Sequence, residues 1–284
     1  MLKQRVITAV VLLAVLLPAL FWPTPWPFAV LMLLAIAAGG WEFARLNGCS
    51  DAGSVSLGLL CVACCAAAWG AGWLERPLPL LWLAAGAAWV LAGGALLRAG
   101  VRGWPGVPRA VRLAGGLAAL CVAWLAVVQA RVTGINFLLS VLLLVWVADI
   151  AAYFAGRAFG LKFTRNKLAP AISPGKSWEG VWGGVAGVLA LAFAWVAADA
   201  HWQVQVPSLY SRLAAVGAWF LVPAAIFLVA MSVVGDLAES LVKRSAGAKD
   251  SSGLLPGHGG VLDRVDALLP TLPLAMMLAT WARP

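Results

Sequence analysis

Apolar runs of about 20 residues recur along nearly the whole chain, and they constrain its fold more than any other feature. A helix needs roughly this many apolar residues to cross a hydrocarbon core of about 30 Å. Because lipid offers the backbone no hydrogen-bond partner, each run is expected to be helical. With 63% hydrophobic and 11% charged residues, the chain also lies far from the composition of a soluble domain. The sequence therefore predicts an all-α, polytopic integral membrane protein.

The apolar runs and the polar breaks between them predict nine transmembrane helices. No polar stretch is long enough to form a separate soluble unit, so we expect one membrane domain over residues 1–284. Within it, residues 1–134 hold the N-terminal spans, and residues 135–284 hold the spans and polar segments suited to chemistry. The nine spans are expected near residues 6–22, 27–46, 54–74, 78–97, 111–130, 135–156, 179–199, 213–234 and 262–282.

The distribution of basic residues predicts the orientation of these spans. With the N-terminus in the cytoplasm, sixteen of the twenty lysines and arginines fall on the inner side. The four on the outer side are Arg76, Arg131, Arg212 and Arg283. Basic residues accumulate in cytoplasmic loops. We therefore expect a multi-pass protein of the inner (plasma) membrane, with its N-terminus and its longest late polar loops in the cytoplasm.

The net charge of +9 does not require a nucleic-acid partner. The positive charges are explained as topology signals, and the sixteen tryptophans fit anchoring at a bilayer interface better than base stacking. We therefore expect no nucleic-acid binding. Cys61 and Cys64 have the spacing of half a metal site, but no second cysteine pair completes it, so we expect ordinary buried thiols.

The segment 235–266 is the most polar part of the chain and combines five carboxylates, four cations and His258. If the part after Asp236 is helical, then Asp236, Glu239 or Ser240, and Lys243 share one face. The glycine-rich stretch 251–260 is expected to be a loop whose N–H groups could meet phosphate oxygens. Asp263 and Asp266 follow at helical spacing. Carboxylates beside such a loop suggest a magnesium–phosphate site, whereas a solvated set of loop charges is the simpler alternative.

A second candidate group follows a long uncharged run and begins with Asp149. Ionisable residues inside a membrane are costly and usually mark a site or an ion pair. Tyr153 and Arg157 follow at steps of four residues, so all three should share one side of a helix. Arg157 lies too far along the helix to reach Asp149 easily, which favours a ligand, a metal or another helix as the partner of Asp149.

The loop 168–180 offers basic and hydroxyl side chains just before a helix expected to begin near Glu179. Gly175-Lys176-Ser177 resembles the end of a P-loop, but Pro170 stands where that motif requires glycine, so we reject the motif. A phosphate group at a helix N-terminus remains physically natural. His258 could be a general base, a metal ligand or simply a turn residue. Glu42 is a weaker candidate for an inward-facing polar group.

The late polar segments resemble the signature of the phosphatidate cytidylyltransferases, or CDP-diacylglycerol synthases. The elements are S-x-x-K-R from Ser240, K-D at Lys249, and H-G-G-x-x-D-R-x-D from His258 to Asp266. The runs 149–160 and 168–180 resemble two further motifs of the family in the same order. The recognisable part covers roughly residues 145–270, and the first 130 residues match only as a hydrophobic multi-span region, with Glu42 a tentative exception.

The resemblance implies that CTP and phosphatidic acid are converted into CDP-diacylglycerol and pyrophosphate. It also implies a Mg²⁺-dependent site, with K⁺ as a candidate second cation, within a membrane protein that forms homodimers. Metal binding is expected at Asp236, Asp263 and Asp266. Catalytic roles are expected for Asp149, Lys176, Lys243, Arg244, His258 and Arg264, and substrate binding for Lys167, Ser173, Ser177, Ser240, Lys249, Gly259 and Gly260.

Two other classes of function remain open from the residues alone. A phosphosugar–polyprenyl transferase or a CTP-dependent lipid kinase would also combine membrane helices with acidic cytoplasmic motifs. A secondary transporter could use Asp149 as its coupling site, but the internal repeat typical of many transporters is not evident.

Overall fold

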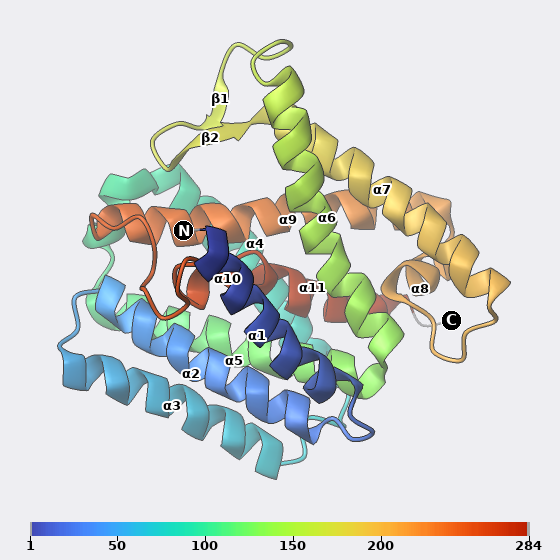
Figure 1. Ribbon diagram of the computed structural model, residues 1–284, viewed down its shortest axis with the longest axis horizontal. Helices are drawn as coiled ribbons and strands as arrows, with labels where there is room; N and C mark the ends of the chain where they lie inside the picture. Colours follow the sequence, from blue (N-terminus) through green and yellow to red (C-terminus); the bar gives the residue numbers. More distant parts are fainter. Residues whose placement is uncertain (1, 283–284) are drawn as a thin grey trace.

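The computed structural model describes residues 2–282 and is almost entirely helical, as expected (Figure 1). The first helices are α1 (Leu2–Phe21), α2 (Trp26–Leu46), α3 (Asp51–Gly70), α4 (Pro79–Gly103), the 3₁₀ turn η1 (Trp104–Gly106), α5 (Arg109–Thr133) and α6 (Ile135–Phe159). A small hairpin of β1 (Lys167–Ala169) and β2 (Ser173–Ser177) follows. The chain continues with α7 (Trp178–His201), α8 (Leu209–Val216), α9 (Ala218–Ser245), α10 (Leu262–Val265) and α11 (Leu268–Trp281).

Eight helices within residues 2–282 are long and apolar enough to cross a membrane, which confirms the multi-pass architecture. They correspond to the first eight predicted spans. The ninth predicted span, 262–282, is instead divided into α10 and α11. At about 1.5 Å per residue, the 14 residues of α11 cover only about 21 Å. They are largely buried within the bundle, and the expected count of about nine spans is roughly consistent with the structure.

The eighth predicted span, 213–234, also needs correction. The chain breaks at Gly217, whose φ of 133° is a conformation that side-chain-bearing residues rarely adopt, so α8 ends there and α9 begins. From Ala218, α9 runs without interruption to Ser245. Asp236 therefore lies inside a helix rather than at its end, and the helical face expected for Asp236, Ser240 and Lys243 exists.

The core is formed where α9 and α11 cross the other helices (Figure 1). The α2–α3 hairpin lies on one side of this crossing and the α6–α7 pair on the other, with the β hairpin beyond the end of α6. The helix α9 packs against α4, α7, α8 and α11, so several elements hold it in place.

Arg131 fixes the first helix to the bundle. Its Nε and Nη2 donate hydrogen bonds to the carbonyl oxygens of Leu20 (2.8 Å) and Trp22 (2.6 Å). The guanidinium is buried and satisfies carbonyls at the end of α1 that have no partner within the helix. Arg283, a further basic residue expected on that side, lies outside the described residues.

The closest helix pair, α6 and α7, meets through small residues. Gly183 and Gly187 of α7 lie against α6: a Cβ atom at Gly187 would lie 2.7 Å from the Cβ of Ala151, and one at Gly183 would overlap Ala155. Because neither glycine has a side chain, the backbones approach closely. This contact holds the part of α6 that carries Asp149 against α7.

We expect Gly183→Leu to destabilise the protein, because an inserted side chain must push α6 and α7 apart. Overpacking of this kind costs about 1–3 kcal/mol. Thermal unfolding in detergent should show a lower melting temperature for Gly183→Leu. The matched control is Gly94→Leu in α4, where an added Cβ meets open space. Equal melting temperatures for the two variants would contradict the close α6–α7 contact.

Candidate active site

A polar cavity of about 420 Å³ lies between α6, α7, α9 and the β hairpin. Asp149, Tyr153 and Arg157 all line it from α6, which confirms that they share one side of that helix. Arg157 does not pair with Asp149. Its Nη1 donates instead to the hydroxyl oxygen of Tyr153 at 3.1 Å. The Asp149 carboxylate thus faces a hollow large enough for a small polar group.

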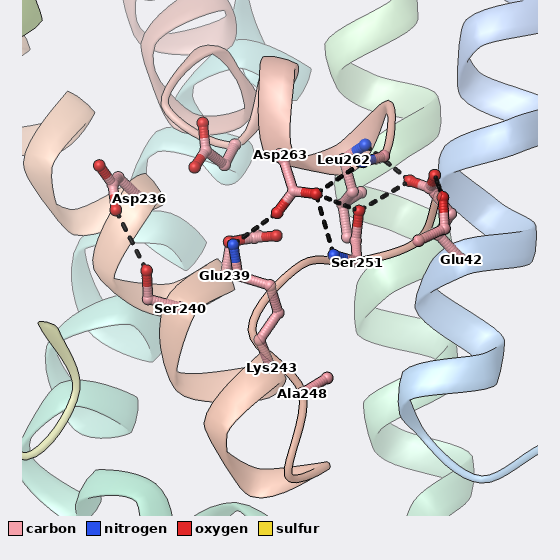
Figure 2. Close-up of polar contacts among 12 residues, drawn as sticks. Glu42, Asp236, Glu239, Ser240, Lys243, Ala248, Ser251, Leu262 and Asp263 are labelled. Atoms are coloured by element: carbon pink, nitrogen blue, oxygen red, sulfur yellow. Dashed lines mark hydrogen bonds and ion pairs between the residues drawn. The ribbon is translucent and has the colours of Figure 1, made fainter. Parts of the chain in front are cut away.

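An ion pair between Lys176 and Asp236 closes one side of this cavity. The Lys176 Nζ lies 2.6 Å from Asp236 Oδ2, and both side chains line the cavity. The hydroxyl of Ser240, one helical turn after Asp236, donates to Asp236 Oδ1 at 3.2 Å (Figure 2). Two residues from separate predicted motifs, about 60 positions apart, are therefore in direct contact.

The β hairpin positions Lys176 and replaces the irregular loop expected over residues 168–180. The Nζ of Lys167 donates to the carbonyl of Pro174 at 2.6 Å across the hairpin, and Ser173 pairs with Ala169 in the strand register. Arg244, at the end of α9, donates from Nε to the carbonyl of Ile172 at 3.4 Å. The tip of the hairpin is thereby tied to α9.

The start of α7 lies at Trp178, close to the predicted start. Ser177 caps it, with its hydroxyl oxygen accepting from the Gly180 N–H at 3.2 Å. Glu179 is buried and accepts hydrogen bonds from the Phe163 and Thr164 N–H groups, at 3.1 and 2.7 Å. Glu179 thus fixes the segment before the hairpin rather than lining the cavity.

Lys243 joins α9 to the segment that follows it. Its Nζ lies 2.5 Å from both Glu239 Oε2 and Asp263 Oδ1 (Figure 2). All three side chains are mostly shielded from solvent. Lys243 thus bridges two acidic side chains, one from α9 and one from the segment that follows it. Charged groups this deep are tolerated because each has an opposite partner.

The Asp263 carboxylate accepts several hydrogen bonds from the preceding loop, in addition to its ion pair with Lys243. Its Oδ2 accepts from the Ser251 N–H at 2.9 Å, the Gly260 N–H at 2.7 Å and the Ser251 hydroxyl at 2.9 Å. Burial by itself would raise the pKa of Asp263. The bonds from Lys243, Gly260 and Ser251 outweigh burial and lower its pKa to about 2. Asp263 is therefore a carboxylate at neutral pH.

Glu42 of α2 anchors the same loop from the N-terminal half of the chain. Its side chain is 0% exposed, and its carboxylate accepts from the N–H groups of Val261 (2.9 Å) and Leu262 (2.7 Å). The hydroxyls of Ser251 and Ser252 also lie 3.2 and 2.5 Å from its oxygens (Figure 2). One carboxylate thus satisfies amides at the start of α10 and two loop hydroxyls.

The Ser251 hydroxyl lies between Glu42 and Asp263. It has one proton, so it can donate to only one of the two carboxylates at a time. Gly260 is enclosed at the same point, since an added Cβ would overlap both Ser251 and Glu42. Because Gly260 has no side chain, the loop can pack directly on Glu42. This packing explains why the predicted motif has glycine at this position.

Asp266 lies between α10 and α11, and its Oδ1 accepts from the Ala267 N–H at 2.7 Å. Burial and then the neighbouring Asp236 carboxylate raise the pKa of Asp266 to about 7. The two carboxylates are therefore close enough to repel. Within residues 2–282, no three Asp, Glu, His or Cys side chains are arranged as a ready-made metal centre.

The carboxylates in this region fit a Mg²⁺ ion held by two protein ligands rather than by the three predicted. The ion commonly takes one or two carboxylates and completes its shell with phosphate oxygens and water. Asp236 and Asp266, whose mutual repulsion a cation would relieve, suit that role. Asp263, the third predicted ligand, is occupied by Lys243 and loop N–H groups in this structure.

The other predicted residues surround this centre. Arg264 and Lys249 are exposed, and Gly259 has a φ of +81°, a left-handed turn that suits glycine. The backbone N–H of His258 donates to the Leu255 carbonyl, and its Nδ1 is buried without a hydrogen-bond partner among the described residues.

Four residues of the site were missed or underrated by sequence reasoning. Ser251 carried no signal beyond its place in a polar stretch, and Glu239 was noted only for its helical spacing. Arg157 was noticed for its spacing but given no role. Glu42 was rated low because its partners lie more than 200 positions away, and no local pattern reveals such contacts.

A cavity lined by carboxylates and cations lies among the membrane-spanning helices, which defines a membrane protein with an internal polar site. A model of the cytidylyltransferase family matches residues 3–281, and the chain belongs to that family. It is 41% identical to a phosphatidate cytidylyltransferase of Pseudomonas aeruginosa, with all of both chains covered. It is 38% identical to one of Haemophilus influenzae over 96% of each chain. A Brucella suis phosphatidate cytidylyltransferase is 46% identical over about half of each chain.

We expect Glu42→Gln to loosen the loop 251–262. The glutamine amide group offers only one acceptor oxygen, and its NH₂ would face backbone donors that need an acceptor. Each buried donor left without a partner costs about 1–3 kcal/mol. Hydrogen exchange should therefore speed up at the Val261 and Leu262 amides.

The matched control is Glu75→Gln, which changes an exposed glutamate in the connection between α3 and α4. It should leave exchange in the loop unchanged. Glu42→Asp keeps the charge and should protect the loop in part. Equal exchange at residues 261 and 262 in Glu42→Gln and in the unmodified protein would show that the carboxylate does not anchor the loop.

Proposed function

We propose that this protein is a phosphatidate cytidylyltransferase that converts CTP and phosphatidic acid into CDP-diacylglycerol and pyrophosphate. The observation that carries this proposal is the Lys176–Asp236 ion pair in the cavity that also contains Asp149 and Arg157. Family membership over nearly the whole chain and the names of the full-length relatives support it.

The reaction transfers a cytidylyl group between two phosphates. An oxygen of the lipid phosphate attacks the α-phosphorus of CTP, and a new P–O bond forms. The bond from the α-phosphorus to the oxygen bridging to the β-phosphorus breaks, and pyrophosphate leaves with that electron pair. The lipid phosphate is already an anionic nucleophile near neutral pH, so a strong protein base is unnecessary. The protein must mainly position two anions and offset their charge.

The cations around the cavity suit this task. Lys176 and Arg157 line the cavity itself, and we assign Lys176 to the triphosphate. Lys243, Arg244 and Arg264 approach from α9 and α10, where they would steady the pyrophosphate or the lipid phosphate. Ser240, Ser173 and Ser177 offer hydroxyls at the edges of the same region. The exposed Lys167 and Lys249 would attract the nucleotide.

The carboxylates divide into two groups. Asp236 and Asp266 would hold Mg²⁺, with K⁺ as a candidate second cation, whereas Asp263 would hold Lys243 and the loop in place. When bound, Mg²⁺ would neutralise part of the triphosphate charge. Asp149 would shape the polar end of the cavity. His258, whose Nδ1 has no partner among the described residues, and the turn at Gly259 and Gly260 would complete the loop beside the nucleotide.

We further propose that the site faces the cytoplasm of the inner membrane, where CTP is available. The predicted distribution of lysine and arginine supports this orientation. Assembly as a homodimer remains a proposal from the family resemblance, and sedimentation in detergent would test it.

The proposal predicts that the purified protein, supplied with Mg²⁺, labelled CTP and phosphatidic acid, forms CDP-diacylglycerol. Asp263→Asn should reduce this rate by at least about 100-fold, as expected when a preorganised electrostatic group is lost. The asparagine keeps the shape of the side chain but removes the charge that pairs with Lys243.

The matched control is Glu75→Gln, an exposed acidic residue between α3 and α4 and outside every predicted motif, which should retain most activity. Equal thermal stability of the two variants would show that Asp263→Asn is folded. Full activity of Asp263→Asn would overturn its role. Phospho-lipid without CDP-lipid would identify a kinase instead, and the absence of any product from the unmodified protein would refute the proposed reaction.

A further inference from the structure

A second hollow lies on the opposite side of α9 from the polar cavity. It is an apolar groove of about 610 Å³ between α4 and α5. The polar cavity is lined by Val233 and Asp236 of α9, whereas the groove is lined by Gly235 and Ala238. At 100° per residue, these two pairs point in nearly opposite directions. The groove is therefore separate from the proposed reaction site.

The groove walls consist mainly of residues with little or no side chain. Ala88, Ala92 and Ala95 of α4 face Gly115 and Ala119 of α5. Both helices pack on α11, and α4 also packs on α9, so these deeper helices form the floor. Small residues on both walls keep the space between α4 and α5 open.

The groove has the length and depth of a lipid acyl chain site. Its lining on α4 extends from Ala85 to Ala99, about 21 Å at 1.5 Å per residue. That is more than half of a hydrocarbon core of about 30 Å. Glu239 also reaches the groove, but its carboxylate is ion-paired with Lys243 at 2.5 Å. The groove surface is otherwise almost wholly apolar.

Arg112 lies at one end of the groove, and one of its N–H groups has no hydrogen-bond partner among the described residues. Arg112 lines the groove, stacks over the Trp104 ring at 5.6 Å, and donates from Nη1 to Asn47 at 3.1 Å. Its Nε is buried and has no hydrogen-bond partner among the described residues. An anionic oxygen at this end would satisfy that N–H.

The surroundings of Arg112 favour an anion as well. Arg98 and Arg102 lie near the end of α4, while the Arg109 guanidinium at the start of α5 already donates to the Gly48 carbonyl. The sequence has no acidic residue between Glu75 and Asp149. The cations complement a phosphate group, because Glu239, the acidic residue of the groove lining, is ion-paired with Lys243. They also disfavour a second copy of this chain in the groove, because that copy would bring the same positive charge to this face.

We propose that the groove binds an anionic membrane phospholipid, with one acyl chain between α4 and α5 and its phosphate at Arg112. This lipid is distinct from the substrate in the polar cavity. Its chain would fill the space beside Gly235 and Ala238 and would support α9 from behind.

The test measures bound lipid and does not depend on enzyme activity. The full chain is reconstituted in equal amounts of phosphatidylglycerol and phosphatidylcholine and repurified in detergent, and retained lipid is measured by native mass spectrometry. We expect one tightly held phosphatidylglycerol per chain. Arg112→Gln should reduce the preference for phosphatidylglycerol about fivefold, as expected for one basic residue at a membrane surface. Arg112→Lys should largely keep it.

Matched control variants test the groove and the headgroup site separately. Ala92→Phe fills the groove and should remove the retained lipid, whereas Ala87→Phe, exposed on α4 but outside the groove, should not. Arg109→Gln, whose guanidinium donates to the Gly48 carbonyl, should leave the preference unchanged.

Equal retention of the two lipids by the unmodified protein would overturn the headgroup site. Lipid retention in Ala92→Phe equal to that in Ala87→Phe would overturn the groove site. A change from dimer to monomer in Ala92→Phe, with no lipid retained by the unmodified protein, would assign the groove to a second copy instead. If Arg112→Gln does not fold, the Ala92 and Ala87 variants still decide the proposal.

Discussion

The hydrogen bonds accepted by the buried Glu42 carboxylate are the interaction on which the rest of the site depends. Through the Val261 and Leu262 amides and the Ser251 hydroxyl, Glu42 fixes the loop that presents Asp263. Asp263 in turn holds Lys243 on α9. A buried carboxylate without these donors would be very costly in an apolar bundle. The loop and the helices therefore stabilise one another.

The helix α9 connects the two functional regions of the molecule. One face carries Asp236 towards the polar cavity, and the opposite face carries Gly235 towards the apolar groove. Gly235 also lets α10 and α11 approach, because a Cβ there would meet the Asp266 carbonyl oxygen at 2.5 Å. Any shift of α9 would thus move Asp236, the groove floor and the Asp266 turn together.

The polar residues of the site are distributed so that no single segment forms it alone. Lys176 comes from the hairpin, Asp149 from α6, Asp236 from α9 and Asp263 from α10. Each motif is short, and each is supported by a different packing contact. The Gly183 contact holds α6 to α7, the Arg244 bond holds the hairpin to α9, and Glu42 holds the loop.

The sequence by itself determined the membrane class, the helical fold and most of the polar positions, because apolar run length and motif spacing are local properties. It also indicated the common helix side of Asp149, Tyr153 and Arg157. Only the tertiary structure decided that the segment 262–282 is a short buried pair of helices. Only the tertiary structure showed that Lys176 contacts Asp236 and that Glu42 anchors the loop before Asp263. These contacts join residues far apart in the chain, so they depend on how the helices pack rather than on any local pattern.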